Sequence, residues 1–357
     1  LSLNERILDA YIGRSLLAER FGAGLGREHA KAIGQLYRLR IAPYLTDRAK
    51  FWPEFGPDLP RNSKRFQAAM SAVDGMVDEA FTGLLKSARQ EAIRVAKMEA
   101  KAIIAGITKI DPVIGAGFAP ADPKLIASAV RQRPFATQGG GAADLKGWYR
   151  TQAISTKARI RQTVVAAVTE GEPIPAIARR IRGTKATGFR DGAMAITRKE
   201  SETVARTVVQ HAMNTARSEV HKANADLLVG ETWTTALDGR VCPRCGPLDG
   251  EVYGLTVGPR APLHPRCRCG RVPVIKGLDE LPPELQGTRS SVDGQVPASV
   301  TFEQWLKRQP SGTVSNVLGR TRADAFLDGK VTLRELLGPD LQPLTLDALA
   351  VKFPAVF

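Results

Sequence analysis

Residues 242–245 read CPRC and residues 264–269 read HPRCRC, and these two turns decide how the second half of the chain folds. All four cysteines of the 357-residue chain lie within these 28 positions, beside one of its four histidines. Each turn places two potential ligands three residues apart, the spacing at which a tight turn directs both side chains at one ion. The sequence therefore predicts a tetrahedral zinc site.

Five side chains compete for the four places of that site. Cys242 and Cys245 are common to both arrangements we consider. A knuckle geometry adds His264 and Cys267, whereas a four-thiolate site adds Cys267 and Cys269. The sequence leaves both open, so the candidate ligands are four of Cys242, Cys245, His264, Cys267 and Cys269.

Two disulfides, or free thiols in ordinary turns, are the alternatives to a metal. The sequence shows no secretory signal and no apolar segment of membrane-spanning length, so we expect folding in a reducing cytosol, where disulfides are uncommon. The segment between the turns is rich in glycine and proline and poor in apolar residues, so a metal cross-link would supply the missing constraint. Because protein groups can fill all four positions, we expect a structural ion rather than a catalytic one.

Five motifs occur in order around these turns. They are an ART helix at 205–207, a strand with Trp233, a D-x-R-x-C turn at 238–242, an LDG hairpin at 248–250 and a terminal CRC at 267–269. In this order they resemble the phage Mu F-like head morphogenesis family of minor capsid proteins. The resemblance covers about 110 residues, and the C-terminal tail also looks like tails found in such proteins; the first 150 or so residues are not covered.

This resemblance implies a virion head component made in small numbers, associated with the portal and with DNA, and no established catalytic reaction. From it we expect a structural minor head protein of a tailed bacteriophage, assembled in the bacterial host cytoplasm and located in the virion head. Its expected role is to bridge head proteins and packaged DNA during assembly, where the head protein is the portal, the major capsid protein or another one. A further expectation is that the protein leaves the head with the genome during delivery.

The charge of the chain independently favours an acidic polymer as partner. Lysine and arginine number 51 against 36 aspartates and glutamates, a formal net charge of +15. Nucleic acid is favoured over membrane because no basic amphipathic anchor or lipidation signal is found, although such a charge also suits solubility or an acidic portal surface. One stretch of 21 positions is strongly basic and nearly free of aromatic residues, which predicts contact with the double-stranded DNA backbone without sequence preference. These candidate residues are Arg179, Arg180, Arg182, Lys185, Arg190, Arg198 and Lys199.

The predicted fold is mainly α, with long amphipathic helices in the N-terminal half and a small α+β C-terminal module stabilised by zinc. The first helix is expected to break at the glycines of 22–26, with a second short helix stopping near Pro43. Apolar residues four and three apart predict a long helix over about 62–110, with a bend or break possible at Gly75 or Gly83.

The expected domains follow from the distribution of proline, glycine and apolar periodicity. They are an N-terminal helical region at 1–110, a Gly/Pro-rich linker at 111–147, a head-morphogenesis domain at 148–275 with its zinc module at about 231–275, a second linker at 276–300, and a docking tail at 301–357 that packs on the main body or on a partner. An aromatic connector at 51–60 is expected to be a locally packed loop.

Two other functions use the same residues. A zinc-stabilised nuclease of the HNH type would need further histidine or asparagine side chains for a catalytic metal, and none follows His264 within reach. A non-specific DNA-binding protein of the zinc-ribbon kind fits the charge but lacks a recognition helix. His211 and His221 lie on a predicted helix without metal-site spacing, so we expect them to be structural or exposed. The sequence thus favours a protein that is not an enzyme.

Overall fold

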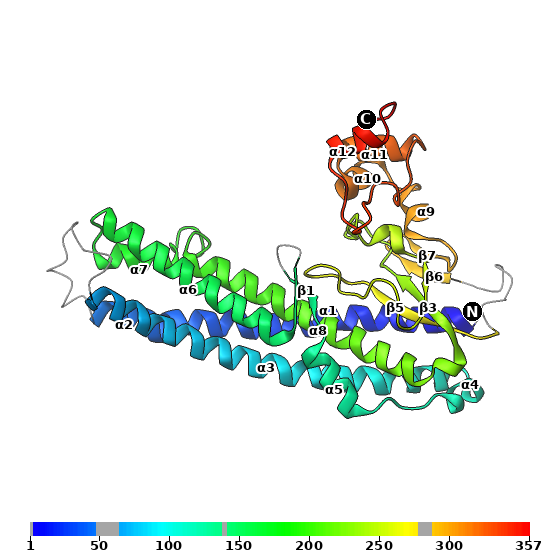
Figure 1. The fold of residues 1–357 in the computed structure, drawn as a ribbon, viewed down its shortest axis with the longest axis horizontal. Coiled ribbons are helices and arrows are strands. Elements are labelled where there is room, and N and C mark those ends of the chain that lie inside the picture. The colour runs from blue at the N-terminus through cyan, green and yellow to red at the C-terminus, as the bar shows by residue number, and fades with distance from the viewer. Residues whose placement is uncertain (1–2, 48–63, 138–140, 278–287) are drawn as a thin grey trace.

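The computed structural model describes residues 3–47, 64–137, 141–277 and 288–357. Its helices form an elongated bundle, and a smaller module with strands and short helices rises from one end of it (Figure 1). The prediction of a mainly helical chain with a small strand-containing C-terminal region is confirmed. The bundle is built from α1 (Leu3–Leu36), α3 (Lys64–Ile110), α6 (Leu145–Thr169) and α8 (Ala193–Ala223). Within the described residues, none of the helices is both long and apolar enough to cross a bilayer.

The long helix predicted from the apolar seam is present as α3. Its first half buries large side chains such as Met70 and Val77, and its second half buries alanines such as Ala88 and Ala92. The helix is continuous through Gly75 and Gly83, so the expected break does not occur.

The expected break at the glycines of 22–26 is wrong, because α1 runs through them without interruption. The reason is the packing of α1 along α8. A Cβ built on Gly22 would lie 2.9 Å from the Cα of Arg206, and one on Gly26 would lie 3.4 Å from the Cα of Glu202. With buried Ala18, these residues form a row of small side chains, one per helical turn, that lets the two backbones meet.

Replacing Gly22 with alanine is expected to destabilise the protein by about 1–3 kcal/mol, because the added methyl group meets main chain that cannot rotate away. Gly24→Ala is the matched control on the same helix. A Cβ on Gly24 meets nothing within 4 Å, and alanine is the better helix former by about 1 kcal/mol. Urea denaturation would therefore move in opposite directions for the two variants, and equal midpoints would contradict the close approach.

The prediction that a second helix stops near Pro43 is also wrong. A π-helical turn, η1 (Tyr37–Ile41), follows α1 directly and leads into α2 (Ala42–Asp47), which contains the proline in its first turn. Ala42 at the start of α2 still donates its N–H to the carbonyl of Tyr37, and proline has no N–H to donate. The wider turn before it accommodates the change in hydrogen bonding.

The expected linker at 111–147 contains ordered elements that pack on the bundle. They are α4 (Pro112–Gly117), α5 (Pro123–Gln132) and a short hairpin of β1 (Phe135–Ala136) with β2 (Ala142–Ala143). Ile126, Val130 and Phe135 belong to the main hydrophobic core. The prolines that suggested a linker instead begin helices, next to the capping carboxylates of Asp111 and Asp122. The glycine run at 139–141 falls mostly outside the described residues, and the division into domains stays a prediction.

The second half begins with α6, a turn, and the short helix α7 (Ile174–Arg182). After α8 and a 3₁₀ turn, η3 (Ala225–Leu227), the chain enters a three-stranded antiparallel sheet in the order β4-β3-β5. Its strands are β3 (Leu228–Thr234), β4 (Val252–Tyr253) and β5 (Gly270–Ile275). The central strand carries Trp233, which is fully buried and belongs to a second core.

That second core joins the sheet end to the C-terminal tail. The expected linker at 276–300 contains a hairpin of β6 (Thr288–Ser291) and β7 (Gly294–Pro297), which bridges to Leu237 through Ser291; residues 278–287 lie outside the described part. The tail consists of α9 (Phe302–Leu306), α10 (Ser311–Leu318), α11 (Arg320–Leu327) and α12 (Leu346–Lys352). Phe302 and Trp305 pack in one core with Cys245 and Leu248. The tail therefore docks on its own chain. The aromatic connector at 51–60 lies outside the described residues.

Two buried histidines make the bundle sensitive to acid. Burial lowers the pKa of His29 and of His211 to about 4. His29 contacts the hydroxyl of Tyr149, and His211 contacts the carbonyl of Val130 with Arg133 nearby. In the unfolded chain these histidines bind protons near pH 6.5, whereas in the folded chain they do so only near pH 4. The free energy of unfolding is therefore highest above pH 6.5 and decreases as the pH falls to about 4, by roughly 3 kcal/mol for each histidine.

Urea midpoints measured between pH 7 and pH 4 test this dependence. A metal ion held by the cysteine turns would also respond to acid, so the informative comparison is between the natural chain and a variant carrying His29→Gln and His211→Gln. We expect a flatter profile for the variant. Parallel profiles would contradict the assignment.

Candidate metal centre

The two cysteine turns are closed by their own main chains. The N–H groups of Cys245 and Gly246 both donate to the carbonyl of Cys242, at 3.0 and 3.1 Å. The N–H of Cys267 donates to the carbonyl of His264 at 3.1 Å. In each turn, the hydrogen bond to the carbonyl of the first potential ligand holds the two potential ligands on the same side of the turn, as their spacing in the sequence predicted.

The potential ligand atoms form two overlapping groups of three that share Cys245. One group is Cys242, Cys245 and His264; the other is Cys245, Cys267 and Cys269, and within each group all ligand atoms lie within 4.8 Å of one another. The Sγ atoms of Cys245 and Cys267 are 3.9 Å apart, close to the ~3.8 Å expected for two thiolates at ~2.3 Å from one tetrahedral ion. All four cysteines are free thiols. The cluster can hold a metal ion.

The chemistry of the donors also fits a metal. A hydrogen bond with Cys245 and the contact with His264 outweigh the opposing effect of burial and lower the pKa of Cys242 to about 5. Contacts with Cys245 and Cys269 lower the pKa of the buried Cys267 thiol well below its usual range. The Nδ1 atom of His264 lies 2.8 Å from the carbonyl oxygen of Pro265, while its Nε2 lies 3.1 Å from the sulfur of Cys242. Thiolates and an imidazole oriented through its second nitrogen are typical zinc ligands.

The second turn is anchored on α8 by the ART motif. Arg266 has a positive φ of 61°, and its N–H donates to the hydroxyl of Thr207 at 3.0 Å. Its guanidinium donates to the hydroxyl of Thr203, one turn earlier, at 3.1 Å. The threonine of the motif therefore fixes the turn between two candidate ligands.

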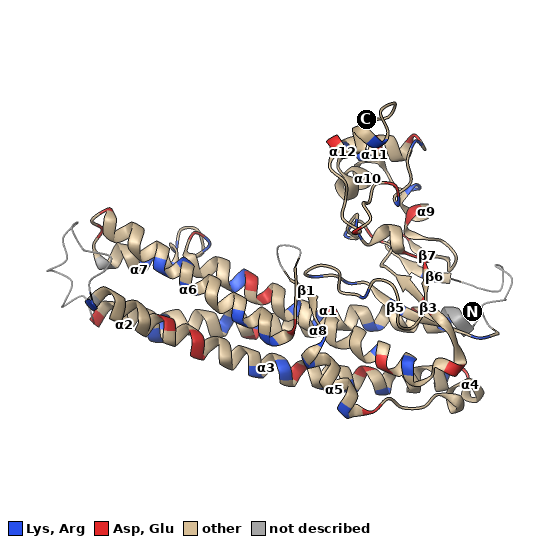
Figure 2. Cartoon of the chain, viewed as in Figure 1, with Lys and Arg blue, Asp and Glu red and all other residues tan. Residues whose placement is uncertain are grey.

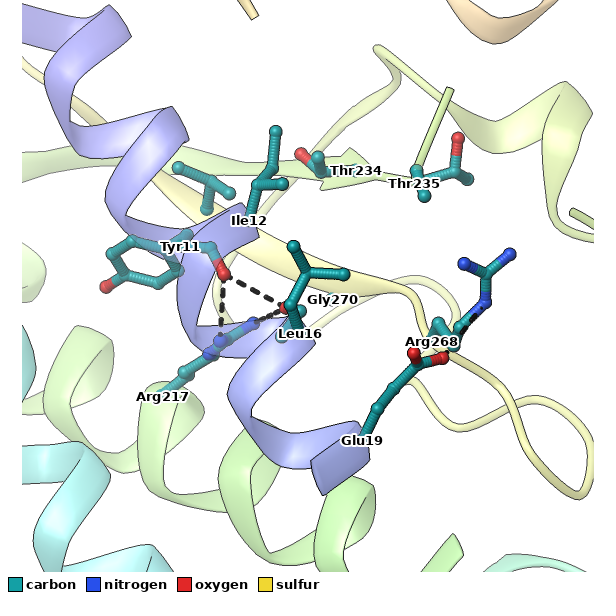
Figure 3. A pocket seen from close by; sticks show the side chains of 12 residues that line it. Tyr11, Ile12, Leu16, Glu19, Arg217, Thr234, Thr235, Arg268 and Gly270 are labelled. Atoms are coloured by element: carbon teal, nitrogen blue, oxygen red, sulfur yellow. Dashed lines mark hydrogen bonds and ion pairs between the residues drawn. The ribbon is translucent and has the colours of Figure 1, made fainter. Parts of the chain in front are cut away.

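The D-x-R and CRC motifs meet at one ion pair. Arg268 donates to both carboxylate oxygens of Asp238 at 2.7 Å. It also lies 3.4 Å from Glu19 of α1, and Figure 3 shows this contact at the edge of a small cavity between α1 and the sheet. On the other side of Arg268, the carbonyl of Cys269 accepts from Asn214 of α8 at 3.1 Å. The candidate metal centre is thereby fastened to two helices of the bundle.

Asp249 connects the candidate metal centre to the tail. From the sequence, its LDG motif indicated only a hairpin turn. Its carboxylate accepts from the N–H of Thr235 at 2.7 Å and from the N–H of Phe302 at 2.8 Å. It also forms a buried ion pair with Arg289 at 2.8 Å. Arg289 lies in the expected linker, where no pattern marked it. The LDG motif thus joins the strand, the hairpin and the first tail helix.

A second buried network joins the sheet to the bundle. Glu231 of β3 contacts Nδ1 of His221 at 2.6 Å, and Nε2 of His221 contacts the hydroxyl of Tyr11 at 2.8 Å. Arg260 and Arg271 also pair with Glu231. Burial raises the pKa of Glu231, but the contacts with His221 and the arginines outweigh it and hold that pKa at about 2. His211 and His221 are both buried and lie outside the two metal-ligand groups.

The seven predicted nucleic-acid-binding residues differ in their surroundings, and their contact with DNA stays a prediction. Arg180 is paired with Glu170 and Glu172. Lys185, Arg190 and Lys199 are exposed. The remaining three line a cleft beside α7, and these are Arg179, Arg182 and Arg198. Figure 2 shows basic and acidic residues interspersed along the helices of the bundle.

Comparison with known families matches one part of the chain. Residues 158–272 match the model of the family described as Phage Mu protein F like protein. The matched segment begins within α6 and ends within β5, so it includes α8, β3 and both cysteine turns. No curated protein and no solved structure gives a significant match. The resemblance inferred from the ordered motifs is confirmed over this segment, and the chain is identified by it as carrying a Phage Mu protein F-like region.

Proposed function

We propose that the chain is a structural minor head protein of a tailed bacteriophage, acting in head morphogenesis as a component of the virion head. The observation that carries the proposal is the family match over residues 158–272. The geometry supports a structural role, because each matched motif is used to hold elements together. Thr207 binds the second cysteine turn, and Arg268 binds the D-x-R turn. Asp249 binds the tail.

We propose zinc as the ion of the metal centre, with a structural role. Three of the five candidate ligands are buried thiols, and sulfur with imidazole is the donor set of structural zinc sites. Cys242, Cys245 and Cys267 are common to both possible sets, while His264 and Cys269 complete one set each. We propose no catalytic activity, since the donors available can occupy all four positions around the ion. A plasmid-cleavage assay with added divalent metal tests this. Cutting that is lost in His264→Ala, with the fold intact, would favour the HNH-type nuclease instead.

The proposed partners are the portal protein and the major capsid protein or other head proteins, with packaged DNA nearby. The net charge of +15 and the exposed Lys185, Arg190 and Lys199 support contact with the DNA backbone without sequence preference. Such contact, as in a non-specific DNA-binding protein, weakens steeply as salt rises.

Co-sedimentation of the purified chain with portal assemblies, at low and at high salt, tests the proposed function. We expect binding to the portal at both salt concentrations, and binding of duplex DNA at low salt alone. A chain that co-sediments with neither the portal nor capsid assemblies under any of these conditions would overturn the proposal.

A further inference from the structure

A large cleft lies at the end of the bundle that carries α2 and α7, away from the metal centre (Figure 1). Its volume is about 1160 Å³, and its walls are the end of α1, η1, α2, α7 and the start of α8. Small-molecule sites usually occupy about 300–1,000 Å³. The size of the cleft is therefore better suited to a segment of polypeptide.

The cations around this cleft lack acidic partners. No aspartate or glutamate is among the residues that line it, and within the part of the chain that the structure describes none of its five cations forms an ion pair. Four of them are exposed and Arg198 is half-buried. The five are Lys31, Arg38, Arg179, Arg182 and Arg198. This concentration of unpaired positive charge favours an anionic occupant.

The floor of the cleft is apolar and held in place. Met194 and Tyr37 are buried, and the hydroxyl of Tyr37 donates to the carbonyl of Ala178 at 2.8 Å. Phe189 has a positive φ of 63° and lies under the guanidinium of Arg182, at 5.4 Å from the ring centroid. Arg198 fixes the same residue by donating to its carbonyl at 2.9 Å. The apolar surface is thus built into the fold before any occupant binds.

We propose that this cleft binds an acidic amphipathic helix of a partner protein, with its apolar face on the floor and its carboxylates at the five cations. The inference deepens the proposed head-protein function, on which it rests, by giving the chemistry of one partner. Duplex DNA satisfies the charges but offers no apolar side chains to fill the floor, whereas an amphipathic helix satisfies both. For this reason we assign Arg179, Arg182 and Arg198 to a protein partner rather than to DNA.

Gly34 of α1 provides a way to fill the cleft without disturbing the fold. It lines the cleft, and a Cβ built on it meets nothing within 4 Å. Gly34→Phe is therefore expected to occupy the floor and leave the bundle intact. Gly13→Phe is the matched control, because Gly13 lies on the same helix, outside the cleft, and its Cβ position is also open.

The experiment titrates the full chain with a fluorescent 15-residue helical peptide that carries leucines on one face and glutamates on the other. We expect saturable binding that weakens at least tenfold in Gly34→Phe and in Arg38→Glu, and that is unchanged in Gly13→Phe and in Arg20→Glu, an exposed position on α1 outside the cleft. A peptide of the same composition in scrambled order should bind at least tenfold more weakly. Circular dichroism of each variant confirms that the helices are retained.

Four results would overturn the inference. The first three are no binding of the peptide, equal binding of the ordered and scrambled peptides, and loss of duplex DNA binding in Gly34→Phe to the same extent as peptide binding. Self-association of the chain that is abolished by Gly34→Phe would also overturn it, since a second copy would then be the occupant. The titration needs no portal, so its failure leaves the co-sedimentation test of the head-protein function unaffected.

Discussion

Cys245→Ser is expected to abolish stoichiometric metal binding and to unfold the C-terminal module while the bundle stays helical. Cys245 is the residue that the two groups of candidate ligands share, so its loss disrupts either ligand set. Structural zinc contributes about 10–16 kcal/mol in small zinc-binding peptides, whereas whole domains are stable by only about 5–15 kcal/mol. The sulfur of Cys245 is also buried in the core that holds Trp233 and Phe302. Elemental analysis and thermal melting measure the two effects.

Matched substitutions at the other ligands decide which set binds the ion. If the knuckle set is correct, Cys269→Ser retains one metal per chain and His264→Ala loses it. The four-thiolate set predicts the reverse. Stoichiometric metal retained in Cys245→Ser, or a melting transition unchanged by chelation of the natural chain, would contradict the metal centre itself.

Asp249→Ala is expected to release the tail from the module at a cost of about 3–5 kcal/mol, because it leaves the charge of Arg289 buried without a partner. The same change removes the acceptor for the N–H groups of Thr235 and Phe302. Limited proteolysis should then cut near residue 300 much faster than in the natural chain. Unfolding in urea, followed by tryptophan fluorescence from Trp233 and Trp305, measures the loss of stability.

Asp328→Ala is the control for this change. Asp328 also lies in the tail, but its carboxylate is exposed and pairs only with Lys330 among the described residues, and such surface pairs contribute about 0–1 kcal/mol. Tail cleavage at the natural rate in Asp249→Ala would show that the tail is held by its apolar contacts alone.

The parts of this structure that the sequence predicted are those set by local spacing. The two cysteine turns and the seam of α3 depend on residues three or four positions apart. The family motifs were also local, and each one marks a contact that the structure shows. Thr207 of the ART helix holds the second turn.

The parts that sequence reasoning missed depend on partners that lie far apart in the chain. Gly22 was expected to break the helix. The structure shows that a glycine is needed there because the backbone of Arg206, 184 residues away in the chain, packs against it. Arg289 stood in a polar stretch with no sign that Asp249 would bury it. The sequence also did not indicate that Arg180 pairs with two glutamates or that Arg179, Arg182 and Arg198 line a cleft, because both depend on the packing of α7 and α8.

The packing of α1 against α8 has a consequence for biosynthesis. The ribosome completes α1 at residue 36, yet the surface that covers its row of small residues is finished only at residue 223. At about 5–20 residues per second, that interval lasts roughly 10–40 s. During this interval the row of small residues on α1 is not yet covered by α8 and can contact other chains. Chaperones, or slow codons before residue 193, would therefore influence the yield of correctly folded protein.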